Sequence, residues 1–206
     1  MAYMFYECHS LKEINLSNFI TDKVIDMRSM FEYCYRLKKL NLWSFNTVNV
    51  KYMNSMFEKC SSLEELNLSN FNTNNVISMS HMFSGCGSIK ELNLLNFNTD
   101  KVQYMDYMFN ECKQLKILKI YNFNIDNVIK MENILNGCSN LYISSNIKDL
   151  IPNKDHNGEN VDGHSKELAQ NSPNIDEDIR NSIGIIIIII FILIFYLLIT
   201  IIKELL

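Results

Sequence analysis

The apolar positions of residues 1–150 recur with a period of 26 residues. One unit has the pattern C-x-x-L-x-x-L-x-L-x-x-F-x-T-x-x-V-x-x-M-x-x-M-F-x-x-C, and its clearest copy runs from Cys60 to Cys86. The same spacing separates all six cysteines, which are Cys8, Cys34, Cys60, Cys86, Cys112 and Cys138. A fixed period of this length predicts a solenoid in which each unit forms one turn and equivalent residues stack.

The first half of each unit predicts a short β-strand. In the copy that begins at Cys60, Leu66 and Leu68 alternate with the polar residues Glu65 and Asn67. A period of two residues is typical of a strand with one buried and one exposed face.

The second half of each unit predicts an α-helix. Val76, Met79, Phe83 and Cys86 stand at relative positions 0, 3, 7 and 10, which is the spacing of one helix face. Thr73 stands just before this segment, where its side-chain oxygen could cap the first free amides of a helix.

Stacking of these units predicts an α/β leucine-rich-repeat solenoid with about six 26-residue strand-helix units. The strands would form a parallel sheet on the concave face, and the helices would cover the convex face. The chain opens in the middle of a repeat, so we expect either that half a helix caps the first unit or that the array is part of a longer one.

The distribution of charge and apolar residues divides the chain into four segments. Residues 1–150 carry 15 Lys+Arg and 15 Asp+Glu, whereas residues 151–182 carry 3 and 7 and contain both prolines, which predicts an acidic flexible linker. Ile183–Ile202 is an uncharged stretch long enough for a single transmembrane helix in a lipid bilayer. Only the short tail of residues 203–206 follows it.

The cysteine column allows three interpretations. Units stacked about 5 Å apart bring cysteines close enough for disulfides, although a regular repeat gives no reason for alternate pairing. A structural zinc site requires local clusters such as C-x-x-C, which this sequence lacks. We favour the third interpretation, in which each cysteine is a small buried apolar residue.

The repeat resembles the 26-residue leucine-rich repeats of BspA-like surface proteins. The segment from Met53 to Thr73, with Met56, Phe57, Cys60, Leu63, Leu66, Leu68 and Phe71, matches that motif closely. The resemblance covers about residues 1–146. It implies a leucine-rich-repeat solenoid that is displayed on the cell surface and functions in adhesion or protein binding, without catalytic residues.

The concave strand face holds the candidate binding residues. Three outward-facing columns line it, and the third breaks the polar pattern of such a face with Trp43, Leu95 and Tyr121. The candidate binding residues from the three columns are Lys39, Trp43, Leu95, Ile117, Lys119 and Tyr121. Aromatic residues are enriched at binding hot spots, so we expect a protein partner, from a host or a second copy, to bind here.

The remaining features argue against catalysis and against binding of nucleic acid. None of the four histidines has a serine, cysteine or carboxylate partner that sequence spacing identifies, and no cofactor or metal motif is present. The net charge of −4 does not fit a nucleic-acid binder. We therefore expect a membrane-anchored surface protein that mediates protein binding or adhesion. The alternative is a tail-anchored intracellular scaffold with cytosolic repeats.

Overall fold

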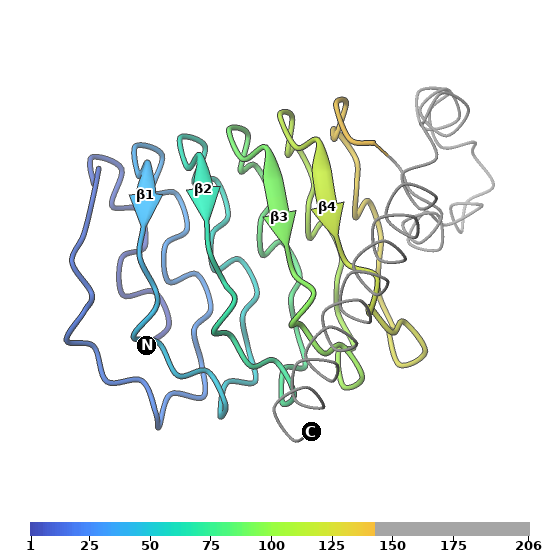
Figure 1. Ribbon diagram of the computed structural model, residues 1–206, viewed down its shortest axis with the longest axis horizontal. Coiled ribbons are helices and arrows are strands. Elements are labelled where there is room, and N and C mark those ends of the chain that lie inside the picture. The colour runs from blue at the N-terminus through green and yellow to red at the C-terminus, as the bar shows by residue number, and fades with distance from the viewer. Residues whose placement is uncertain (143–206) are drawn as a thin grey trace, which may run out of the picture.

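The computed structural model describes residues 1–142, which form a stack of similar coils (Figure 1). Equivalent positions of neighbouring coils pair with a register of 26 residues, as in the pairs Lys39↔Glu65 and Glu91↔Ile117. The predicted period therefore sets the length of one coil. The described residues lie within the predicted repeat domain of residues 1–150. The predicted linker (151–182), transmembrane segment (183–202) and tail (203–206) lie outside the described residues.

One side of the stack carries four short strands. Strand β1 (Lys39–Leu40) pairs in parallel with β2 (Glu65–Leu66), and β3 (Glu91–Asn93) pairs in parallel with β4 (Ile117–Lys119). The pairs form two separate two-stranded sheets. The exposed side chains of these strands and of the residues directly after them define the strand face of the molecule. Alternation of exposed and buried residues, as in β3, confirms the predicted strand pattern.

The opposite side of each coil corrects the helix prediction. No helix forms within residues 1–142, and this part of the chain therefore contains no helix that could cross a membrane. The segment from Met53 to Cys60 instead forms consecutive tight turns. Its amides alternate between two kinds of acceptor, since Met56 N donates to Met53 O at 3.2 Å whereas Phe57 N donates to Met82 O in the next coil at 3.0 Å.

The same alternation repeats in every coil and makes a second ladder along the stack. The amides of residues 27, 29, 31 and 33 donate to oxygens 52, 54, 56 and 58, and those of residues 53, 55, 57 and 59 donate to oxygens 78, 80, 82 and 84. Each turn segment is therefore hydrogen-bonded to the next coil much as a parallel strand would be. The prediction of a strand-helix leucine-rich-repeat solenoid is therefore wrong for residues 1–142, which contain strands and turns but no helix.

Two physical factors explain why turns replace the helix. Paired strands stand about 4.8 Å apart, whereas packed helices require about 8–10 Å between their axes. Coils with strands on one side and turns on the other can keep the strand spacing on both sides. The turns also require left-handed backbone at regular positions, and Ser55 and Lys59 have φ angles of 56° and 59°. A positive φ at the third residue of a turn is the geometry of type II turns, and it is incompatible with an α-helix.

The threonine column joins coils and does not cap helices. Thr47 is buried, and its Oγ1 donates to Asn72 O at 2.9 Å and accepts from Asn72 N at 2.8 Å. Thr21, Thr73 and Thr99 make the same pair of bonds to Asn46, Asn98 and Asn124. Each hydroxyl therefore satisfies two main-chain groups of the following coil. Ile125 occupies this position in the next unit, so the threonine ladder ends there.

The core consists of columns of equivalent apolar side chains. Phe57 is fully buried, and its ring is stacked on Phe31 at 5.9 Å and on Phe83 at 5.7 Å between centroids. The six cysteines are free, and five of them are buried, so the prediction of an apolar cysteine column is confirmed and the disulfide alternative is wrong. Each of the five also donates its S–H to a main-chain oxygen, as Cys60 Sγ does to Phe31 O at 3.1 Å.

Candidate functional site

The strand face is built by a turn that follows each strand. Asn67 Oδ1 accepts a hydrogen bond from Ser69 N at 3.0 Å, and Asn41 Oδ1 accepts one from Trp43 N at 3.1 Å. Such local side-chain bonds end the extended segment after two or three residues, because they compete with continued strand pairing. The residue two places after each of these asparagines thus stands exposed at the end of a strand.

The structure places all six predicted binding residues on this face. Trp43 is 68% exposed, Leu95 is 45%, Ile117 is 44% and Tyr121 is 37%, while Lys39 is exposed and Lys119 is half-buried. Trp43, Ser69, Leu95 and Tyr121 occupy the same position in four consecutive coils. Leu95 and Tyr121 therefore adjoin each other, whereas Ser69 separates Trp43 from Leu95.

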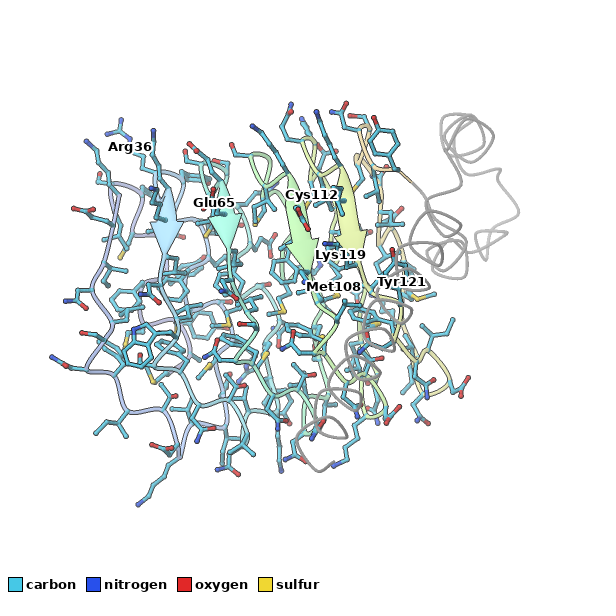
Figure 2. All side chains as sticks on the ribbon, viewed as in Figure 1. Arg36, Glu65, Met108, Cys112, Lys119 and Tyr121 are labelled. Carbon is cyan, nitrogen blue, oxygen red and sulfur yellow. The ribbon has the colours of Figure 1, made fainter. Side chains whose placement is uncertain are left out.

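One of the predicted lysines is already paired. Lys119 Nζ lies 2.7 Å from Glu91 Oε1, which joins β4 to β3 on the strand face. Figure 2 shows Glu65 on β2 and the neighbouring positions of Lys119 and Tyr121 at the end of β4. Lys119 thus neutralises Glu91 in the free protein, and it is a weaker candidate for contact with a partner than Trp43 or Tyr121.

An open groove of about 820 Å³ lies on this face between β2 and β3. One wall comes from the coil of β2 and the other from the coil of β3. Its lining residues are Glu64, Glu65, Leu66, Asn67, Leu68, Ser69, Lys90, Glu91, Asn93, Leu95 and Asn96. Volumes of this size are common for ligand sites, which makes the groove a candidate site on the strand face.

The sequence analysis included Leu95 among the candidate binding residues, but it did not include the other residues of this groove. One signal was available, because Glu64 occupies a position that holds lysine in the other four described coils, at Lys12, Lys38, Lys90 and Lys116. The opening between two coils has no counterpart in the sequence pattern, since the 26-residue period continues through it unchanged.

A second polar cluster lies among the turns and includes His81. Its ring nitrogens are 3.7 Å from Glu58 Oε1 and 3.7 Å from Asp106 Oδ2, and its ring is stacked on Tyr107 at 4.8 Å. Contact with the Glu58 carboxylate raises the pKa of His81, and the charge of Asp106 acts in the same direction. Sequence spacing did not identify these partners of His81, because Glu58 and Asp106 belong to the coils on either side of it.

This cluster lacks the geometry of a nucleophile with its base. Ser80 Oγ donates to Asp106 Oδ1 at 2.7 Å and not to the imidazole. A hydroxyl nucleophile requires contact with its general base. Within residues 1–142, no group of three or more His, Cys, Asp or Glu side chains is placed to hold a metal ion. The strand face is thus the better candidate for function.

The fold and this face define a class of protein, namely a solenoid of stacked 26-residue coils with one exposed strand face. The chain belongs to the family DUF285, described as "Mycoplasma protein of unknown function", whose model matches residues 1–113, 34–149 and 59–175. The overlapping matches agree with a repeated motif. No curated protein and no solved structure matches the chain.

Proposed function

We propose that this protein is an interaction module that binds another protein through its strand face. The observation that carries the proposal is the row of exposed apolar side chains, Trp43, Leu95 and Tyr121, beside an open groove. Large aromatic side chains at the centre of an otherwise polar face are typical of binding hot spots. The stacked coils support such a face because hydrogen bonds between coils hold each strand in place.

Capture of partners by full-length protein tests this proposal. A Trp43→Ser/Tyr121→Ser double variant removes two aromatic side chains from the strand face. The matched control is Ile20→Ser/Ile129→Ser, because these residues are 84% and 70% exposed but lie outside the strand face. We expect partners that cross-link to the wild type and to the control to be lost from the double variant. Equal capture by all three proteins would contradict the proposal.

We further propose that the repeats act at the cell surface, as adhesion or receptor-like modules. The support is the likeness of the repeat motif to that of BspA-like surface proteins. Protease treatment of intact cells tests this location. Loss of the repeat domain is the expected result, and protection until the cells are permeabilised would contradict it.

The second candidate is an intracellular scaffold that uses the same strand face. The observation in its favour is the set of six free cysteines, since disulfides are rare in reducing compartments. Five of these thiols are buried, and so they would also be shielded from oxidation outside the cell. The same protease experiment therefore decides between the two locations.

A further inference from the structure

The groove lies where the sheet hydrogen bonding is interrupted. Between β1 and β2, Glu64 N donates to Lys38 O at 3.3 Å, and next to β3 and β4, Lys116 N donates to Lys90 O at 2.9 Å. No corresponding main-chain bond joins the segments 64–68 and 90–94, although both lie in the described part of the chain. Some main-chain groups of these segments are used elsewhere, since Glu64 N donates to Lys38 O and Leu94 N donates to Lys119 O. The main-chain groups that have no such partner are not bonded across the groove, and they remain available to an external partner.

Side-chain bonds hold the two walls together at both ends of the groove. Asn96 Nδ2 donates to Leu68 O at 2.9 Å and to Phe71 O at 2.7 Å, and Ser88 Oγ donates to Ser61 O at 2.7 Å. The turn ladder also continues across this pair of coils, with Lys59 N donating to Ser84 O at 2.7 Å. The separation is thus confined to the strand face, and the groove is a bounded feature of the stack.

The charges that line the groove are predominantly negative. Glu64, Glu65 and Glu91 face one ammonium group, that of Lys90. Lys119 neutralises Glu91, but neither Glu64 nor Glu65 forms an ion pair within residues 1–142. An incoming cationic group would therefore meet two free carboxylates on the β2 side.

Apolar surface lies next to these carboxylates. Leu66 is half-buried, whereas the equivalent residues Leu40, Leu92 and Leu118 are at most 7% exposed. Leu95 adds a second exposed apolar side chain to the lining. Long cationic side chains bury their methylene stems against such surface while their charged ends remain at polar groups.

We propose that the groove between β2 and β3 binds an extended basic segment of a partner polypeptide. Alternate side chains of an extended chain point to the same side, so every second residue would enter the groove. Arginine or lysine at those positions would pair with Glu64 and Glu65, and the main chain of the segment would use the free amides and carbonyls of the walls. This inference rests on the proposed function, for which it names the chemistry of the partner.

The test uses the full-length protein and a short peptide of alternating threonine and arginine. Two further peptides replace arginine by glutamine or by glutamate. Trp43 is the only tryptophan and lies on the coil beside Ser69, which lines the groove, so its fluorescence reports on binding. Calorimetry provides the dissociation constant independently.

We expect saturable binding of the arginine peptide that weakens with added salt, and weak or no binding of the other two. Glu64→Gln/Glu65→Gln should raise the dissociation constant by about tenfold or more, a change of about 1.4 kcal/mol. Glu13→Gln is the matched control, because Glu13 occupies the position of Glu65 in the first coil and lies outside the groove. Binding by this control should equal that of the wild type.

Two results would overturn the inference. One is equal binding of the arginine and glutamate peptides, and the other is arginine-peptide affinity that does not change in Glu64→Gln/Glu65→Gln. Partner capture that depends on Trp43 and Tyr121 but not on Glu64 and Glu65 would overturn the inference and leave the proposed function standing. Partner capture that is unchanged in both double variants would contradict both the proposed function and this inference. Identical thermal unfolding of the two glutamine variants excludes a folding defect as the cause.

Discussion

The buried hydroxyl of Thr73 satisfies both main-chain groups of Asn98 in the next coil. Oγ1 donates to Asn98 O at 2.8 Å and accepts from Asn98 N at 2.7 Å. One side chain thus makes two hydrogen bonds between coils, at a position where the sequence predicted a helix cap. The relationship shows that polar residues, as well as the apolar core, hold the stack together.

Replacement of Thr73 by valine should destabilise the protein by about 1–3 kcal/mol. Valine has nearly the same shape but leaves the amide and the carbonyl of Asn98 without partners. Urea denaturation of both proteins measures the difference. Thr73→Ser is the control, because it retains the hydroxyl, and it should be less destabilising than valine. A valine variant as stable as the wild type would show that these two bonds contribute little.

Gly85→Ala should destabilise the protein by about 1–2 kcal/mol, the cost of left-handed backbone in a residue with a Cβ atom. Gly85 has a φ of 73°, and a Cβ there would stand 2.5 Å from Lys59 Cδ. The matched control is Gly87→Ala, since its φ is not in the left-handed region and its new Cβ would meet no atom closer than 4.0 Å. Chemical denaturation should separate the two variants clearly. Equal loss of stability in both would point to a general effect of replacing glycine.

The buried thiols should resist alkylation in the folded protein. Burial raises the pKa of Cys34 to about 11 and that of Cys86 to about 12, so little reactive thiolate forms near pH 8. Cys8 is less buried and should react first. Iodoacetamide labelling followed by mass spectrometry, with and without urea, measures this order. Rapid labelling of Cys86 without urea would contradict the arrangement of the core.

The contribution of His81 to stability should decrease as the pH rises. Its pKa is raised above the ordinary value of 6.5 by Glu58 and Asp106, so the folded state binds the proton more tightly than the unfolded state. The stabilisation is therefore fully present below pH 6.5 and is lost as the pH rises through the folded-state pKa. Burial also raises the pKa of the nearby Glu32.

Denaturation midpoints across this pH range should show a smaller decline in His81→Gln than in the wild type. His9→Gln is the control for the loss of one imidazole, since the His9 side chain is 52% exposed and 4.0 Å from its only acidic partner within residues 1–142. The same pH dependence in His81→Gln and wild type would assign the decline to other groups.

The period, the strands and the buried columns could be predicted from the sequence because they depend on burial. Cys60, Met79 and Phe83 are core residues in any stack of 26-residue coils, and the structure confirms this. The burial pattern could not exclude an α-helix in the second half of each unit. Apolar residues at spacings of three and four suit both a helix face and a series of tight turns, so the pattern does not decide which main-chain bonds form.

The positions with left-handed backbone distinguish turns from a helix, but the residue types at these positions do not reveal that conformation in the sequence. Gly85 and Gly137 mark one such column, whereas Lys59 and Glu111 occupy it in other coils. The six candidate residues lie on the strand face because alternation along a strand predicts which side chains point outward, and their role in binding stays a prediction. The groove could not be predicted, since an interrupted set of hydrogen bonds between two coils leaves the apolar pattern intact.

The bonds between coils also bear on how such an array can change its length. Within residues 1–142, successive coils donate to residues 25 positions further along the chain, both through the turn amides and through the threonine hydroxyls. Duplication or deletion of one whole 26-residue unit therefore reproduces every connection at the new junction, whereas insertion of a single residue misaligns them all. Gene segments that encode whole units can thus be gained or lost without disturbing the remaining stack. Copies formed in this way are free to diverge at exposed positions such as that of Trp43.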